Sequence, residues 1–369
     1  MSKNESVPFN DLSRIHRPLL EQFRGGLTHL VENSSLVLGQ EVTSFEQELA
    51  LAEGCDFAIG ANNGTSAIEL ALRALDIGPG DEVITTAFTF VATCFSILQT
   101  GAIPVLVDID PLTGLLDPAG IERVITPKTK AVVFVTLHGR VENLEQIQAI
   151  CKAHNLRFVI DAAQSHLGTF NGRPQTEFCD AATLSFYPGK NLGALGEGGA
   201  ILTNSRELKD RLLLMRDWGA SEKYNHTVWG GNFRLESLQA SFLRIKLREL
   251  KNWTEERQRI ADTYRQRLNP AYLMKPISRE SSHVYHVFSI VVSNRAEFCD
   301  HLNQNQIAFG FHYPKAIHQQ PAYSSKILNP VPLAHSEWLA NSTVSIPIFP
   351  GQTDKEIRKV VEEVNQWTP

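Results

Sequence analysis

The chain has 369 residues, a formal net charge of −5 at pH 7 and an apolar fraction of 43%. This length allows one large and one small domain with ordinary hydrophobic cores. Acidic and basic residues are interspersed, so no basic field exists to hold nucleic acid or an anionic membrane, and small molecules are the expected partners. The amino terminus lacks a signal-peptide core and no stretch approaches roughly 20 apolar residues, so we expect a cytoplasmic protein. Five scattered cysteines without a CxxC pair argue against a disulfide framework or a zinc site.

Short apolar, β-rich runs alternate with amphipathic stretches between about residues 55 and 205. This alternation predicts βαβ units and a mainly parallel sheet flanked by helices. One helix is expected to begin in NNGTSAIELAL, and another at Asp117 and Pro118, an N-cap followed by proline at the first helical position. The expected strands are DEVITT, PVLVDID, AVVFVTL, RFVIDAA, AATLSF and AILTN.

The pattern changes after about residue 233, where apolar residues keep helical spacing through RLESLQASFLRIKLRELKNW and predict one long helix. A small α+β domain is expected to follow, with strands in HVYHVFSIVV and near IAFGFHY and a helix after Asn294. The capping-box pair Thr353 and Glu356 predicts the last helix. We therefore expect an α/β protein with a large domain over residues 1–240. The long connecting helix and the small domain occupy residues 241–369.

Two polar residues follow strands of the predicted sheet. Asp161 ends the run RFVID, and Lys190 lies in the glycine-rich loop SFYPGKNLGALGEGG. Both are expected at the carboxyl edge, where open α/β sheets bind ligands. A lysine that forms an imine and a carboxylate that faces a ring nitrogen are the two groups a pyridoxal phosphate (PLP) site requires. Taken alone, Lys190 could be a solvated surface lysine, and Asp161 could cap a following helix. A Walker A loop is excluded by Leu184 and Asn191.

The chain resembles the DegT/DnrJ/EryC1/StrS family of sugar aminotransferases, within the aspartate aminotransferase superfamily. The resemblance implies a fold-type I PLP-dependent transferase. Lys190 resembles the lysine that holds the cofactor aldehyde as an imine and, once free, moves a proton. Asp161 resembles the partner of the pyridine nitrogen. The blocks that carry the likeness are GQEVTSFEQELA, NNGTSAIELAL, GPGDEVITTAFTFVAT, PVLVDIDP, VIDAAQS, SFYPGKNLGALGEGGAILTN, GGNFRLESLQASFLRIKL and HYPKAIHQQPAY.

The resemblance also implies a phosphate site. A phosphate requires backbone N–H groups at a helix start together with hydroxyls. Gly64, Thr65 and Ser66 provide such a start, and Ser185 adds a hydroxyl. Gln164 resembles the residue that contacts the 3′ oxygen of the cofactor. An ordinary helix N-terminus and a surface glutamine are the alternative interpretations of these residues.

Further residues are assigned by the same likeness. Phe88 resembles the aromatic residue that stacks on the pyridine ring, although an isolated phenylalanine is more often part of a core. Asn232 and Arg234 correspond to residues that reach across a dimer, to the phosphate and to the mouth of the site. Asn232 could otherwise cap the long helix. His312 and Tyr313 resemble residues that close the sugar site. The resemblance thus implies a homodimer with shared active sites.

The implied reaction is amino-sugar biosynthesis by transfer of an amino group from L-glutamate to a nucleotide-linked 3- or 4-keto-6-deoxyhexose. Many family members have His-Leu-Tyr-Gly where this chain has residues 136–139, and histidine where it has Trp218. A keto-cyclitol or an unlinked keto-sugar therefore remains an alternative acceptor. A related sugar dehydratase would carry histidine in place of Lys190. A cofactor-binding regulator without enzymatic activity is the alternative of a different class, although the sequence shows no basic patch for DNA.

Overall fold

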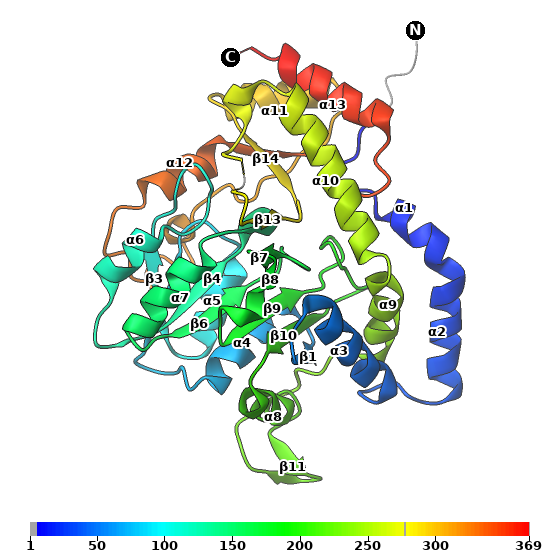
Figure 1. Ribbon diagram of the computed structural model, residues 1–369, viewed down its shortest axis with the longest axis vertical. Helices are drawn as coiled ribbons and strands as arrows, with labels where there is room; N and C mark the ends of the chain where they lie inside the picture. The colour runs from blue at the N-terminus through cyan, green and yellow to red at the C-terminus, as the bar shows by residue number, and fades with distance from the viewer. Residues whose placement is uncertain (1–5, 277, 369) are drawn as a thin grey trace.

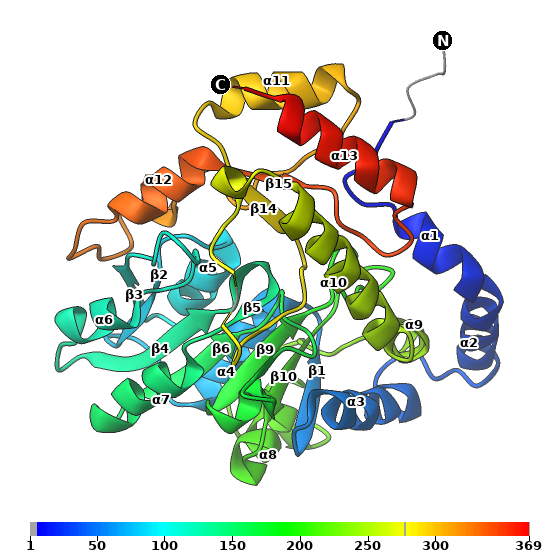
Figure 2. The same cartoon turned by 45° about the horizontal axis from the view of Figure 1, so that its top comes forward.

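The computed structural model describes residues 6–276 and 278–368, so the expected domain ends at residues 1–5 and 369 lie outside the described residues. Its centre is a seven-stranded sheet of order β1-β10-β9-β6-β4-β2-β3 (Figures 1 and 2). Strand β10 runs antiparallel to both of its neighbours, and the other pairs are parallel. The α/β class and all six predicted strands are confirmed. The strands are β1 (Phe57–Ala61), β2 (Glu82–Thr86), β3 (Ile103–Val107), β4 (Thr129–Val135), β6 (Arg157–Asp161), β9 (Ala181–Ser185) and β10 (Gly199–Thr203).

Helices cover both faces of the sheet, because successive residues of a strand point to opposite faces. In β4, Val133 packs into the core formed with α4 and α8, whereas Val132 and Phe134 pack into the core formed with α3 and α7. Burial on both faces explains why these strands read as continuous apolar runs. The predicted start at Asp117 is confirmed, with Pro118 as the first residue of a short helix. The covering helices are α3 (Gln40–Glu53), α4 (Gly64–Ala74), α5 (Val91–Gln99), α6 (Pro118–Ile121), α7 (Leu144–Ala153) and α8 (Arg206–Met215).

A separate core lies in the C-terminal region, where β14 and β15 pair antiparallel. Asn294 caps α11, and the predicted capping box of Thr353 and Glu356 begins α13. The amino-terminal segment joins this layer: the Val7 N–H donates to the Gln306 carbonyl at 2.9 Å. Figure 2 shows the layer beside the central sheet. Its elements are α10 (Leu250–Arg267), β14 (Phe288–Val291), α11 (Arg295–Gln304), α12 (Ala334–Ser342), β15 (Thr343–Ile346) and α13 (Asp354–Gln366).

Three secondary-structure predictions for the C-terminal half are wrong. The single long helix is divided into α9 (Ser237–Leu247) and α10, with a turn in which the Glu249 N–H donates to the Lys246 carbonyl. The α9 helix spans the expected domain boundary after residue 240, and the core of the sheet extends to Leu250. The run HVYHVFSIVV forms two strands, because its start, β13 (Ser282–His283), pairs with β5 (Arg140–Val141) and its end forms β14.

The expected strand near IAFGFHY is also wrong. This segment makes isolated bridges instead, Ile307 with Val7 and Gly310 with Ser345. Each bridge joins it to a different partner segment, so a continuous ladder does not form.

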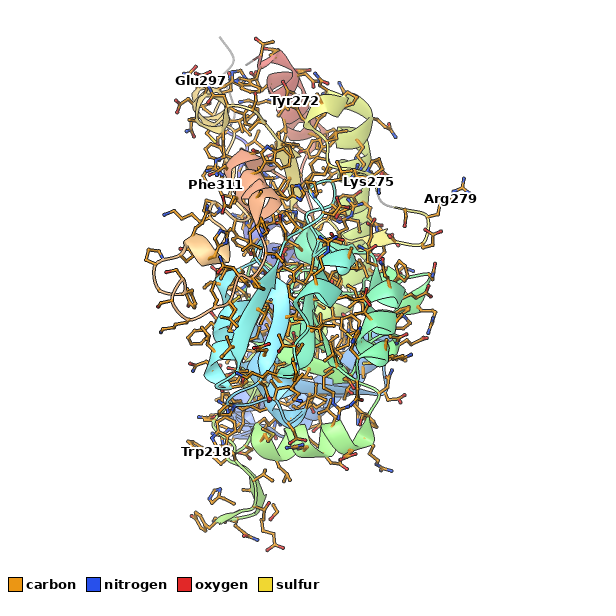
Figure 3. The ribbon with its side chains drawn as sticks, turned by 90° about the vertical axis from the view of Figure 1, so that its left-hand side faces the viewer. Trp218, Tyr272, Lys275, Arg279, Glu297 and Phe311 are labelled. Carbon is orange, nitrogen blue, oxygen red and sulfur yellow. The ribbon has the colours of Figure 1, made fainter. Side chains whose placement is uncertain are left out.

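A hairpin of β11 (Ala220–Glu222) and β12 (Asn225–His226) projects from the body (Figure 1). Trp218 lies at its base, far from Phe311 beside the predicted sugar-site residues (Figure 3). At the amino terminus, α1 (Leu12–His16) leads to α2 (Leu20–Glu32), which packs on α9. Among the helices of the described residues, none has the length and apolarity needed to cross a membrane.

Candidate active site

The loops that follow five strands meet at one edge of the sheet. Strands β2, β4, β6 and β9 are parallel neighbours, and β1 runs in the same direction because β10 is antiparallel to both β1 and β9. Their carboxyl ends therefore place the predicted cofactor residues together. Within the described residues, no group of three or more histidine, cysteine or acidic side chains is placed to hold a metal ion.

Asp161 ends β6 and is 5% exposed. One carboxylate oxygen, Oδ2, accepts a hydrogen bond from Thr93 Oγ1 at 2.8 Å, and the other accepts from the Ala163 N–H at 3.2 Å. Burial raises the pKa of the carboxyl group, and the Thr93 and Ala163 hydrogen bonds and the charge of Lys190 oppose this rise. Turns follow Asp161. The interpretation of Asp161 as a helix cap is therefore wrong.

Lys190 lies in the turn after β9, where its N–H donates to the Tyr187 carbonyl at 2.8 Å. Its side chain is half-buried. Burial lowers the pKa of the ammonium to about 8, and the nearby charge of Asp161 acts in the opposite direction. A lysine with this pKa is more readily deprotonated near neutral pH than an exposed one, as a nucleophilic amine requires.

The start of α4 and the end of β9 make a close contact. A Cβ atom on Gly64 would lie 2.6 Å from the Cβ of Ser185, so only glycine permits this approach. Asn63 caps the helix by accepting a hydrogen bond from the Ser66 N–H at 2.8 Å. Thr65 is the second residue of the helix, so it lies directly after Gly64 at the helix start. The structure thus brings Gly64, Thr65, Ser66 and Ser185 together, and N–H groups at a helix start suit a phosphate.

A hydrogen-bond chain joins the sheet edge to the C-terminal region. The Gln164 side chain donates to Tyr313 OH at 3.1 Å and accepts from the His138 N–H at 2.6 Å. The His138 ring contacts the His312 carbonyl through Nε2 at 2.9 Å. Burial lowers the pKa of His138 to about 4, so the ring is neutral at pH 7 and donates from Nε2. No role as a link was predicted for His138 from the sequence, although its position three residues after the end of β4 was an available signal.

Phe88 and Phe90 differ in exposure. Phe88 is fully buried, and its ring meets the His138 ring edge-on at 6.4 Å. It therefore lies in the core and presents no free face to a ligand, contrary to its predicted stacking role. Phe90 is 52% exposed, and its ring lies 5.4 Å from that of Tyr313. Phe90 thus places an exposed aromatic ring beside the hydrogen-bonded chain, and no role was predicted for it from the sequence.

Asn232 and Arg234 lie in the loop before α9. Glu236 is the N-cap residue of α9, so the alternative role of Asn232 as a cap is wrong. Asn232 is exposed, and its carbonyl accepts a hydrogen bond from Asn62 Nδ2 at 3.5 Å. Arg234 donates to Asp217 Oδ1 at 2.6 Å. The Asn62 contact places this loop beside the segment that leads into α4.

Comparison with known proteins agrees with this geometry. A model of the DegT/DnrJ/EryC1/StrS aminotransferase family matches residues 19–365. The chain belongs to this family. PLP is the family's cofactor. The match covers both the sheet edge and the C-terminal residues that contact it.

Individual members of the family are similar over nearly the whole chain. The dTDP-3-amino-3,6-dideoxy-alpha-D-galactopyranose transaminase of Aneurinibacillus thermoaerophilus is 40% identical, over 98% of this chain and 99% of the relative. A "Pleiotropic regulatory protein" of Geobacillus stearothermophilus is 39% identical, over 98% of each chain. The crystal structure of Streptomyces venezuelae DesV in complex with a ketimine intermediate has a TM-score of 0.95 at 35% identity, with 98% of each chain covered. The fold is therefore that of the fold-type I PLP-dependent aminotransferases.

Proposed function

We propose that this protein is a PLP-dependent aminotransferase that moves an amino group from L-glutamate to a nucleotide-linked keto-sugar. One observation carries the proposal: buried Asp161 and half-buried Lys190 lie at one sheet edge, close enough for their charges to interact, and burial lowers the lysine pKa to about 8. Beside them lies the helix start at which only Gly64 fits. These are the groups that PLP requires, so the residues present fit the cofactor.

Each group of the site has a defined task in this proposal. The cofactor, when bound, supplies an electron-accepting ring. Lys190 would hold its aldehyde covalently and, once released, carry a proton to and from the reacting carbon. Asp161, oriented by Thr93, would keep the ring nitrogen protonated. The helix start and the Ser185 hydroxyl would bind the phosphate.

The acceptor would lie between the sheet edge and the C-terminal region. There Gln164 is hydrogen-bonded directly to Tyr313 and is linked to His312 through His138. Phe90 offers an exposed ring for the cofactor or the sugar. The name of the Aneurinibacillus relative supports a nucleotide-linked deoxysugar. A 3- or 4-keto-6-deoxyhexose is the preferred acceptor. The regulatory name of the Geobacillus relative supports a binding role, but a cofactor-binding regulator would not need a lysine with a lowered pKa beside a buried carboxylate.

The proposed active unit is a homodimer. Asn232 is exposed next to the segment that leads into α4, and would complete the phosphate site of the second subunit. Lys190→Ala and Asn232→Ala homodimers should each be nearly inactive. Heterodimers of one Lys190→Ala and one Asn232→Ala subunit, with subunit exchange verified, should regain activity. Both changes then affect the same site, and the other site is wholly wild type. Inactive heterodimers would show that Asn232 serves its own chain.

The function is tested in two stages. Protein loaded with cofactor is first incubated with L-glutamate alone, and we expect about one 2-oxoglutarate per site. It is then offered dTDP-linked 3- and 4-keto-6-deoxyhexoses, the unlinked sugars and a keto-cyclitol, with Lys190→Ala as the control. Amination of a nucleotide-linked sugar is the expected result. Failure to release a 2-oxo acid from glutamate or any other amino donor would contradict the proposal.

A further inference from the structure

A second lysine lies buried close to the active-site loop. Lys246, in α9, is 0% exposed. Its Nζ donates to the Gly193 carbonyl and to Nε2 of His16, the latter at 3.0 Å. Burial lowers the pKa of Lys246 to about 8. Removing an ammonium from water costs several kcal/mol, so the Gly193 and His16 contacts have to offset that cost.

Gly193 belongs to the loop that carries Lys190. The loop is tightly folded, because a Cβ atom on Gly193 would lie 2.3 Å from the Pro188 carbonyl oxygen. The Lys190 N–H donates to the Tyr187 carbonyl within the same turn. Gly193 and Lys190 are thus parts of one tightly folded loop.

Other side chains hold the same loop. Gln239, also in α9, accepts a hydrogen bond from the Leu195 N–H at 2.9 Å. Asn191 donates to the Val284 carbonyl at 3.0 Å. Lys246 differs from both because it also contacts His16 at the end of α1. Burial and the charge of Lys246 lower the pKa of His16 to about 4, so its neutral ring accepts the hydrogen bond.

We infer that Lys246 is a positioning residue for Lys190: its ammonium holds the Gly193 end of the loop and couples the loop through His16 to α1. The inference rests on the proposed function only for the chemical use of Lys190. Methionine has a similar volume and no charge, but it cannot donate to the Gly193 carbonyl. The substitution Lys246→Met therefore separates packing from positioning.

The test uses the cofactor-free full chain in four forms: wild type, Lys246→Met, Lys246→Arg and the control Lys251→Met, at an exposed position of α10. Backbone hydrogen exchange is measured by mass spectrometry in the loop and in β4. The pH midpoint of Lys190 modification by acetic anhydride is measured by peptide mapping. The groups that face Lys190 are Asp161 and the neutral rings of His166, His286 and His312.

In Lys246→Met we expect about tenfold faster exchange in the loop and no change in β4. The Lys190 midpoint should rise from about 8 toward the ordinary lysine value, because a loosened loop admits water to the ammonium. Lys246→Arg should restore both readouts in part, and Lys251→Met should match wild type. If the methionine variant does not fold, Lys246→Gln should show the same direction of change.

Wild-type hydrogen exchange in the loop, together with a wild-type pH midpoint for Lys190 modification, in folded Lys246→Met would overturn the inference. Equal acceleration of exchange in β4 and the loop would also overturn it, because that result indicates general destabilisation. Neither readout uses cofactor or substrate. A failure here therefore leaves the proposed transamination standing, and a failure of the glutamate assay leaves the positioning role standing.

Discussion

The two edges of the central sheet contain the same kinds of charged residue in different surroundings. At the carboxyl edge, burial raises the pKa of Asp161 and lowers that of Lys190. At the amino edge, Arg157 and Asp180 form an ion pair at 3.3 Å, with side chains 54% and 32% exposed. Exposed pairs of this kind contribute about 0–1 kcal/mol to stability. The two edges therefore differ in the burial of their charged residues more than in residue type, and buried groups with shifted pKa values are typical of functional sites.

The largest effect is expected from replacing Asp161 at the carboxyl edge, and Asp180 at the amino edge provides the matched control. Asp161→Ala should slow release of 2-oxoglutarate in a single turnover by about 10²–10³-fold, because the ring nitrogen loses the charge that keeps it protonated. Asp180→Ala, the matched change at the amino edge, should leave that rate within about twofold. Rapid-quench kinetics on cofactor-loaded protein measures both. Equal rates in the two variants would remove the distinction between the edges.

A smaller effect separates two aromatic residues of the carboxyl edge. Phe90→Ala should weaken cofactor binding by about 3- to 10-fold and change the unfolding free energy by less than about 0.5 kcal/mol, because its ring is exposed. Phe88→Ala should cost about 3–5 kcal/mol of stability, because its ring is fully buried in the core. Cofactor titration and urea denaturation check the pair. A binding defect confined to Phe88→Ala would restore the stacking role predicted from the sequence.

The smallest effect concerns the pH dependence of stability. Folded Lys190 loses its proton near pH 8, whereas the unfolded chain keeps it to about 10.4, so the unfolded state binds more protons in this window. The contribution of Lys190 to stability therefore rises with pH between about 8 and 10. Cofactor-free Lys190→Met should be more stable than wild type at pH 7, and the difference should shrink across this window. A difference in urea midpoint that stays constant with pH would contradict the burial of Lys190.

Much of the fold could be predicted from local patterns. Strands such as β4 and β6 are buried on both faces, so their apolar runs are unmistakable, and the capping box at Thr353 needs only neighbouring residues. The break between α9 and α10 falls at Arg248 and Glu249, where neither glycine nor proline marks it. The division of residues 282–291 into two strands depends on which distant strand each half pairs with. Such tertiary choices leave no local signal.

The residues of the candidate site could also be predicted only in part from the sequence. Asp161 and Lys190 could be selected because each follows a strand of the parallel sheet and lies in a block that resembles the family. Phe88 and Phe90 occupy alternate positions of one short segment, and only the packed structure shows which of them is exposed. The links through His138 and Lys246 join residues that are distant in sequence. Their roles depend on contacts that a single sequence does not display.

Borohydride reduction of the cofactor-loaded protein, followed by peptide mapping, tests the central claim most directly. Reduction makes the link between the cofactor and its lysine permanent, so the modified residue can be identified by mass. We predict one cofactor per chain, on Lys190. Modification of another lysine, or none in protein reconstituted with cofactor, would contradict the assignment of this sheet edge as the catalytic site.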